Sequence, residues 1–231
     1  MLAAGAVAVV AADQVEEHVE LPPSLRNARS LPECPEFARV FGKRFFVMHT
    51  FGEGSCFFHA LAAAICKGYD ALTKSKERAA VGLALRDSIY RYTNEQMYAD
   101  AVAYVQQKYQ RHKAERPSHA PPVPEIPSYW EFKQRLKDKA VWADLVMISF
   151  VAFTFGYNLL FWSDQDCQFY YGCDQLELKN THPTVFILWR DRTHFELVVR
   201  MLPDGTVERQ FHWPKHAKLL ERVEAEYRGR R

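Results

Sequence analysis

Cys56, a cysteine directly before an apolar segment, has the character of a nucleophile. Cys56 lies between a glycine-containing turn, residues 52–54, and an apolar segment, residues 57–66, that ends near Gly68. We expect it in the first turn of a helix, where outward-pointing N–H groups and the helix dipole favour a thiolate. The alternative is a structural cysteine that caps a core helix, because free cysteines are among the most buried residues.

A histidine and an acid occur together far downstream. Residues 184–189 have the composition of a buried strand, and a short polar break separates them from a second strand that begins at His194. Alternation along that strand predicts that His194 and Glu196 share one face. Together with Cys56 they supply the parts of a Cys–His–acid nucleophilic site. Taken alone, His194 would be interpreted as a strand-end histidine near solvent.

Three segments of the chain resemble the motifs of one family. The sequence GEGSCFFHAL around Cys56 is similar to the nucleophile motif of the ovarian-tumour (OTU) cysteine proteases. HFELV, which starts at His194, resembles their histidine motif, and VWAD at residues 141–144 resembles their Trp-Gly/Ala-Asp signature. The motifs occur in the order that the family has, and they frame residues 42–213.

The resemblance implies a papain-type fold and a deubiquitinase, which hydrolyses the bond after the C-terminal glycine of ubiquitin or a ubiquitin-like modifier. By position, Cys56 is the nucleophile and His194 the general base. Glu196 stands where the family has its third residue, usually Asp or Asn. Glu53 stands where the family usually has Asp, in the turn before the nucleophile. Both acids are one methylene longer than the family's aspartate, and the role of the third residue could lie elsewhere.

The substrate-side roles come from the same resemblance and its chemistry. Backbone N–H groups around Glu53, Gly54 and Cys56 are expected to stabilise the oxyanion, with Gly54 and Ser55 next to the substrate. Phe195 is expected in the wall of the channel for the modifier's tail, and a core aromatic is the equal alternative. The mechanism requires neither a metal nor an organic cofactor.

Composition limits the classes of partner. The chain has 231 residues, of which 48% are hydrophobic and 25% charged, and a formal net charge of +2. This balance favours one substantial core and predicts no nucleic-acid or membrane partner. Five cysteines without a CxxC pair indicate a reducing, intracellular compartment, which is the cytoplasm of a host cell if the chain is a viral or bacterial effector. We expect a monomer that binds ubiquitin or polyubiquitin chains.

The elements that must position these residues follow from periodicity and end signals. Helices are predicted at residues 57–66, 74–92, 94–113, 128–139, after Asp144, and at 214–228, and strands at 44–50, 157–162, 168–171, 184–189, 194–201 and 206–211. This order predicts an α+β (mixed α/β) domain, whose central sheet is packed between helical regions. Residues 1–35 form a lead-in, residues 36–231 the catalytic domain, and residues 70–140 by resemblance a surface that faces ubiquitin.

Two other functions remain open from the sequence. The first is a catalytically weak or silent ubiquitin-binding module with the same fold, which the longer acids Glu53 and Glu196 leave possible. The second is an unrelated cysteine protease or acyltransferase. For the enzyme, we predict that Cys56→Ala and His194→Ala abolish cleavage and that Glu196→Ala costs less.

Overall fold

The computed structural model describes residues 25, 35–42, 44–51, 54–115, 125–171, 178–179 and 181–229. Most of the N-terminal lead-in, Glu53 and most of the proline-rich segment after residue 115 lie outside these ranges. The helices are α1 (Pro35–Phe41), α2 (Cys56–Ile65), α3 (Ser75–Tyr92), α4 (Glu95–Glu115), α5 (Tyr129–Lys137), α6 (Leu145–Phe155) and α7 (Ala217–Gly229), with a short 3-10 helix at Tyr69–Ala71. The strands are β1 (Phe45–Met48), β2 (Asn158–Ser163), β3 (Gln168–Tyr171), β4 (Thr184–Arg190), β5 (His194–Met201) and β6 (Val207–Glu208).

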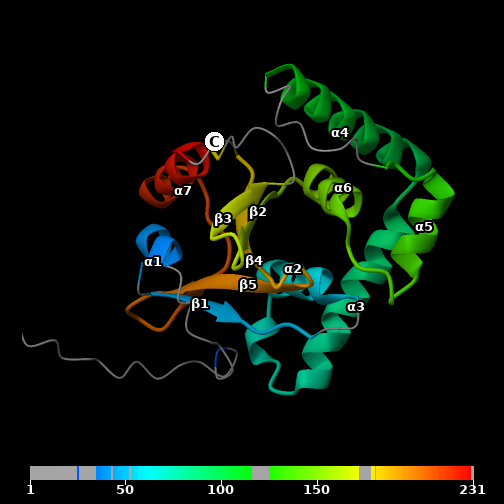
Figure 1. Ribbon diagram of the computed structural model, residues 1–231. Coiled ribbons are helices and arrows are strands. Elements are labelled where there is room, and N and C mark those ends of the chain that lie inside the picture. The colour runs from blue at the N-terminus through cyan, green and yellow to red at the C-terminus, as the bar shows by residue number, and fades with distance from the viewer. Residues whose placement is uncertain are drawn as a thin grey trace, which may run out of the picture.

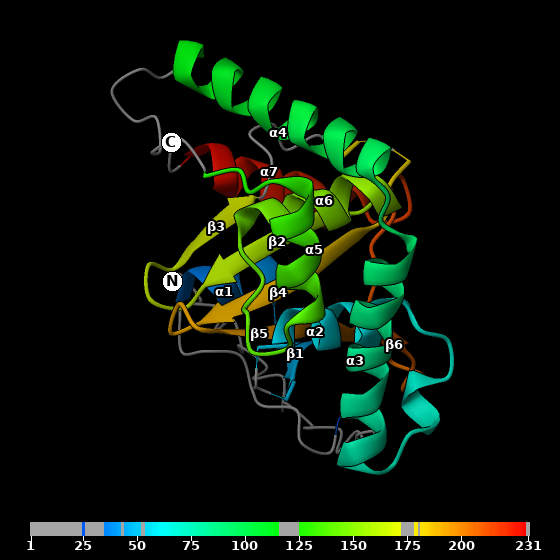
Figure 2. The same cartoon turned by 90° about the vertical axis from the view of Figure 1, so that its right-hand side faces the viewer.

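The strands form one mixed sheet in the order β1-β5-β4-β2-β3, with β6 paired to β5. Only β2 and β4 run parallel, and the other pairs are antiparallel. Helices cover both faces of this sheet (Figures 1 and 2): α1 and α7 lie on one side, and α2 to α6 lie on the other. The structure confirms the predicted α+β class and the packing of the sheet between helical regions.

Each face of the sheet has its own core, because side chains alternate along each strand. Phe161, Ile187 and Leu197 belong to the core beneath α2 to α6. Trp162 and Leu188 belong to the core beneath α1 and α7. The two central strands β2 and β4 are therefore buried on both faces, which accounts for their nearly continuous apolar sequences.

Predicted end signals are present at two helices. Ser128 and Glu131 form a capping box at the start of α5, with reciprocal bonds between side chain and backbone of 3.3 and 2.7 Å. Asp144 caps α6 and accepts the N–H of Met147 at 2.8 Å. Asp144 thereby ends the loop at residues 138–144, whose backbone at Lys139 and Ala140 lies against Gly54 in the turn before Cys56.

Two predicted elements at the C-terminal end differ from the structure. The predicted strand at residues 206–211 is reduced to β6, because Phe211 pairs with Thr184 at the start of β4 instead of extending the hairpin. The last helix begins at Ala217 and not at 214, because residues 213–216 form turns in which the His216 ring accepts the N–H of His212. Within the described ranges, no helix combines the length and apolar character needed to cross a membrane.

Candidate active site

Cys56 is the first residue of α2, as predicted. It follows the N-cap residue Ser55, and its residue surface is 5% exposed. Burial raises the pKa of the Cys56 thiol, while the backbone N–H groups of Phe195, Phe57 and Cys56 itself lower it. The amide of Phe195 lies directly after His194 in the chain. The fold therefore brings the thiol to the strand end that carries the predicted base.

A tight turn between β4 and β5 presents His194 at the first position of β5. Arg190 pairs with His194, and the intervening Asp191 and Arg192 have positive φ angles of 49° and 55°. Two consecutive left-handed residues are typical of hairpin turns that follow the twist of the strands. The predicted polar break is thus a turn, and it sets the position of His194 at the start of β5.

Thr50 determines the tautomer of His194. The Nε2 atom of His194 lies 3.1 Å from Thr50 Oγ1 and 3.2 Å from the Thr50 carbonyl oxygen. A carbonyl oxygen only accepts, so Nε2 carries the hydrogen. The Thr50 hydroxyl donates its own hydrogen to the carbonyl of Phe195 and is therefore also an acceptor for His194. Neutral His194 consequently keeps its basic lone pair on Nδ1.

The strand register explains why Thr50 has this position. Met48 pairs with Leu197 at the end of the β1–β5 ladder. Continuing the antiparallel register by one residue places His49 opposite Glu196, and by two residues places Thr50 opposite Phe195. The hydrogen bonds of His49 and Thr50 follow this continuation. The segment between β1 and the nucleophile turn is therefore part of the site.

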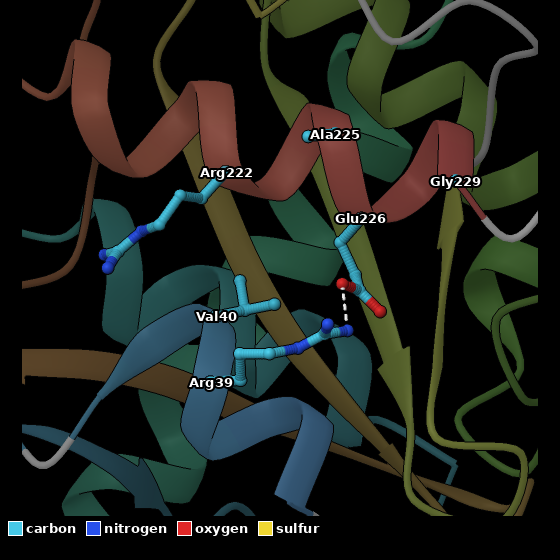
Figure 3. Close-up of a pocket in the computed structure, with 6 residues that line it drawn as sticks. All are labelled: Arg39, Val40, Arg222, Ala225, Glu226 and Gly229. Atoms are coloured by element: carbon cyan, nitrogen blue, oxygen red, sulfur yellow. Dashed lines mark hydrogen bonds and ion pairs between the residues drawn. The ribbon is translucent and has the colours of Figure 1, made fainter.

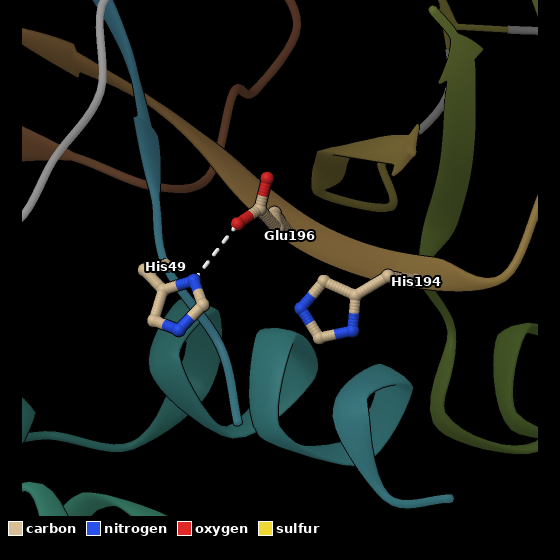
Figure 4. Close-up of side chains that lie close together, drawn as sticks. All are labelled: His49, His194 and Glu196. Atoms are coloured by element: carbon tan, nitrogen blue, oxygen red, sulfur yellow. Dashed lines mark hydrogen bonds and ion pairs between the residues drawn. The ribbon is translucent and has the colours of Figure 1, made fainter. Parts of the chain in front are cut away.

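The carboxylate of Glu196 contacts other partners than the imidazole it was expected to orient. Its Oε1 lies 3.0 Å from His49 Nδ1, and its Oε2 accepts from Arg190 Nε at 2.8 Å. Figure 4 shows the Glu196 carboxylate directed at His49, with His194 beside the pair. Among the described residues, the hydrogen-bond partners of His194 belong to Thr50. Glu196 affects His194 through its charge, which raises the pKa of that imidazole.

The protonation states of Cys56 and His194 are set mainly by burial. Burial lowers the pKa of His194 below 6.5 despite the opposing charge of Glu196, and it raises the pKa of Cys56 above 9.0. A thiolate–imidazolium pair requires the opposite order of the two pKa values. The resting pair is therefore a neutral thiol and a neutral imidazole, and proton transfer belongs to the reaction itself.

One nitrogen or oxygen atom from each of His49, His194 and Glu196 lies within 4.8 Å of the others, a spacing that a metal ion could bridge. The carboxylate is already bonded to His49 and to the Arg190 guanidinium. The guanidinium charge opposes a cation at the same carboxylate, so we interpret this group as a hydrogen-bonded network.

The turn before Cys56 is held against the loop after α5. Gly54 has a φ of +78°, and a Cβ at this position would lie 2.2 Å from the carbonyl oxygen of Lys139. The Ser55 hydroxyl accepts from Arg86 at 3.1 Å instead of capping α2. Only glycine tolerates this backbone angle and close approach at position 54. The placement of Gly54 and Ser55 next to the substrate stays a prediction. The predicted role of Glu53 lies outside the described residues.

Phe195 is a core residue in the structure. It is 7% exposed, and its ring packs against Phe57, Phe161 and Trp189 at centroid distances of 5.9, 5.5 and 6.2 Å. This packing favours the core alternative over the channel wall. Its backbone contributes to the site, since its amide faces the thiol and its carbonyl accepts from Thr50.

A third histidine, His59 on α2, holds the segment that leads into the turn before Cys56. The Phe51 N–H donates to His59 Nδ1 at 2.9 Å, and His59 Nε2 lies 2.5 Å from the Tyr69 hydroxyl. Burial and neighbouring positive charges lower the pKa of His59 to about 4. His59 is therefore neutral at pH 7, and the unprotonated Nδ1 is available to hold Phe51.

Five residues of the site were missed by sequence reasoning: His49, Thr50, His59, Arg86 and Arg190. A signal was present for Arg86, because it lies four residues after Gly82 and three before Ile89, on the buried stripe of α3. A charged residue on an apolar stripe indicates a buried polar partner. Thr50 and His49 carry no such pattern, because the register that places them depends on pairing with β5.

A pocket of about 440 Å³ lies between α1 and α7 (Figure 3), on the side of the sheet opposite α2. It is lined by Arg39, Val40, Arg222, Ala225, Glu226 and Gly229, and Arg39 is paired with Glu226 across it. The pocket shares no residue with the Cys56 site, and the chemistry described above does not involve it.

Comparisons with known proteins give structural likenesses alone. No protein-family model and no curated protein matches the sequence. Similar solved structures include an OTU domain in complex with ubiquitin, with 11% identity over 79% of this chain and 84% of that chain and a TM-score of 0.43. The OTU domain of OTUD1 has 12% identity, 73% and 95% coverage and a TM-score of 0.40. The Hazara virus OTU bound to ubiquitin has 13% identity, 68% and 82% coverage and a TM-score of 0.39.

These structures carry the name of the family that the three sequence motifs resemble. Identities of 11–13% and TM-scores below 0.5 leave the chemistry to be argued from the residues of the site.

Proposed function

We propose that this chain is a cysteine deubiquitinase of the OTU type, which hydrolyses isopeptide or peptide bonds after the C-terminal glycine of ubiquitin or a ubiquitin-like modifier. The observation that carries the proposal is the orientation of His194. Thr50 binds its Nε2–H, so Nδ1 is left as the base, and the amide of Phe195, directly after His194, bonds the thiol of Cys56 at a helix N-terminus. An oriented base and a thiol at this position are the minimum that thiol acyl transfer requires.

The reaction follows from this arrangement. His194 Nδ1 takes the proton of Cys56 as the sulfur attacks the scissile carbonyl carbon, and the carbonyl oxygen becomes an oxyanion. The amides that lower the pKa of the thiol, with those of Gly54 and Ser55, are the candidate donors to that charge. Collapse breaks the C–N bond, and His194 returns the proton to the leaving amine. Water, deprotonated by the same nitrogen, then hydrolyses the thioester and regenerates Cys56.

The assignment of ubiquitin as substrate is supported by the motif resemblance and by two exposed aromatic residues in the predicted ubiquitin-facing region. Tyr92 at the end of α3 and Trp130 at the start of α5 are 75% and 70% exposed. Both lie in the predicted ubiquitin-facing region, residues 70–140, and exposed aromatic side chains are enriched where proteins bind one another. Action as a monomer in an intracellular compartment belongs to the same proposal.

A cleavage assay tests the proposal. Ubiquitin with a fluorogenic C-terminal leaving group should be hydrolysed by the wild-type chain, and a panel of diubiquitins should show which linkages are cut. Cys56→Ala and Cys66→Ala form a matched pair, since Cys66 lies at the other end of α2. Loss of turnover in the first variant alone supports the proposal. Turnover that survives Cys56→Ala contradicts it.

A silent ubiquitin-binding module is the second candidate, and one observation favours it. Burial raises the pKa of Cys56, which disfavours the thiolate in the free protein. Ubiquitin binding with no turnover by the wild-type chain would support this function. Turnover of peptides together with indifference to ubiquitin would instead indicate a different cysteine hydrolase.

A further inference from the structure

Arg86 on α3 is a buried cation whose partners are almost all backbone carbonyls. The residue is 2% exposed, and its guanidinium carbon Cζ lies over the ring of Phe58 on α2, 5.0 Å from the ring centroid. Its Nε donates to the carbonyl of Leu136 at 2.9 Å. Its Nη1 donates to Gly54 O at 3.1 Å, to Ser55 Oγ at 3.1 Å and to Lys139 O at 3.3 Å. Its Nη2 donates to Arg135 O at 2.8 Å, to Asp138 O at 2.6 Å and to Val141 O at 2.8 Å.

One group of these acceptors belongs to the C-terminal end of α5. Arg135 and Leu136 lie in the last turn of the helix, which ends at Lys137, and their carbonyls have no partner within the helix. The negative end of the helix dipole lies at the same point. Arg86 thus provides both the donors and the positive charge that this helix end requires.

The other group belongs to the turn before Cys56. Because the peptide bond is planar and trans, its C=O and N–H point in opposite directions. Arg86 draws the Gly54 carbonyl toward itself, so the N–H of Ser55 in the same peptide points away from the guanidinium. The left-handed backbone at Gly54 and its close approach to Lys139 leave the turn little freedom to rotate that peptide.

We propose that Arg86 is a positioning residue that fixes the peptide plane before Cys56 by tying the nucleophile turn to the C-terminal end of α5. The catalytic part of this inference rests on the proposed function, because it requires that the amides of the turn stabilise an oxyanion. Lysine cannot replace this arginine, since an ammonium offers three donors at one point whereas the guanidinium fork reaches two segments at once.

The test separates positioning from folding by comparing two reactions of the same thiol. Alkylation of Cys56 by iodoacetamide displaces iodide and forms no oxyanion, whereas acyl transfer does. We expect Arg86→Lys to lower kcat on a ubiquitin substrate at least tenfold, with KM and the alkylation rate of Cys56 within about twofold of wild type. Arg228→Lys, an exposed arginine on α7, outside residues 70–140 and on the other side of the sheet, is the control and should change none of these values. A proportional fall of kcat and alkylation rate, or an unchanged kcat, would overturn the proposal.

Hydrogen exchange provides a measurement that does not depend on ubiquitin. Arg86→Lys should increase amide exchange in residues 54–58 and in residues 136–141, which are far apart in the sequence, while the strands stay protected. Unchanged exchange in the nucleophile turn overturns the proposal. If exchange increases in both segments but the chain does not act on ubiquitin, the positioning role is supported and only the proposed function is contradicted.

A milder variant guards against a failure of Arg86→Lys to fold. Ser55→Ala removes one acceptor on the nucleophile side and leaves every contact with α5 in place. We expect it to lower kcat about two- to fivefold with unchanged exchange in residues 136–141. If Ser55→Ala increased amide exchange equally in residues 54–58 and in residues 136–141, the separate contacts of Arg86 with the nucleophile turn and with α5 would not be independent, and the proposal would be contradicted.

Discussion

Thr50 and His194 form the contact that defines this site: the imidazole Nε2 lies within 3.2 Å of both the hydroxyl and the carbonyl oxygen of Thr50. The contact turns the basic nitrogen of His194 away from β1. It also assigns to a neutral residue the orienting role that an acid two positions after the histidine was expected to have.

Replacement of Thr50 by valine should therefore impair catalysis more than folding. Thr50→Val keeps the shape and the backbone carbonyl but loses the hydroxyl that accepts from His194 and donates to Phe195. We expect kcat/KM to fall about tenfold and the free energy of unfolding to fall by about 1–2 kcal/mol. Thr50→Ser, which retains the hydroxyl, is the control. Equal kcat/KM for wild type and Thr50→Val would remove Thr50 from the site.

Glu196 should affect catalysis through its negative charge, which acts on the pKa of His194. Glu196→Gln keeps an acceptor near His49 and Arg190 but removes the charge that raises the pKa of His194. The acid limb of the kcat/KM profile should therefore move to lower pH, with kcat at neutral pH within about tenfold of wild type. A pH–rate profile of the wild type and of Glu196→Gln gives both the position of the acid limb and kcat at neutral pH. Complete loss of activity, equal to that of His194→Ala, would mean that Glu196 orients the base directly.

The resting pair of Cys56 and His194 should be neutral. Because the Cys56 pKa is raised and the His194 pKa is lowered, alkylation of Cys56 should still be accelerating above about pH 8. Peptide mapping distinguishes this thiol from the other four cysteines of the chain. A rate that is already constant below about pH 7 would reveal a thiolate–imidazolium pair and contradict this account.

His59 should make the fold sensitive to acid. Its pKa is about 4 in the folded protein against 6.5 for the free side chain, so the unfolded state binds more protons between these values. Stability is then complete above pH 6.5 and falls by about 3 kcal/mol as the pH drops to about 4. Urea unfolding at several pH values measures this slope.

His59→Asn is the matched variant for the acid measurement. Asparagine keeps an acceptor for the Phe51 N–H but does not titrate. It should be less stable than wild type at pH 7, because the bond to Tyr69 is lost, and should have a shallower acid slope. Parallel loss of stability in the two proteins would assign the slope to other groups.

A comparison of alanine variants at Gly54 and Gly205 separates the cost of backbone strain from the cost of steric conflict. Both have φ near +80°, but a Cβ at Gly54 meets the Lys139 carbonyl oxygen at 2.2 Å and a Cβ at Gly205 meets nothing within 4 Å. Gly205→Ala should cost about 1 kcal/mol of stability, and Gly54→Ala about 2–4 kcal/mol with loss of turnover. Thermal unfolding of the two variants gives the comparison. Equal costs would show that the loop after α5 moves aside freely.

The sequence was a good guide wherever local signals determine structure. The apolar segment that ends near Gly68 located α2, and alternation along β5 placed His194 and Glu196 on one face. The capping residues Ser128 and Asp144 marked the starts of α5 and α6. Cys56 and His194 could be selected because their residue types and motifs are local.

The partners of these residues could not be found in the same way. Thr50 acts through the register between β1 and β5, which join segments almost 150 positions apart. Arg86 acts through carbonyl groups, which every residue has and no sequence pattern reveals. Glu196 stood at the expected position, and its longer side chain contacts His49 and Arg190.

The central claim is that Cys56 attacks the carbonyl at the C-terminus of ubiquitin. The most direct measurement is incubation of the chain with ubiquitin that ends in a thiol-reactive electrophile, followed by intact mass and peptide mapping of the adduct. We predict one ubiquitin per chain, attached at Cys56, and no adduct in Cys56→Ala. Attachment at another cysteine, or binding of ubiquitin without any covalent adduct in the wild-type chain, would contradict the claim.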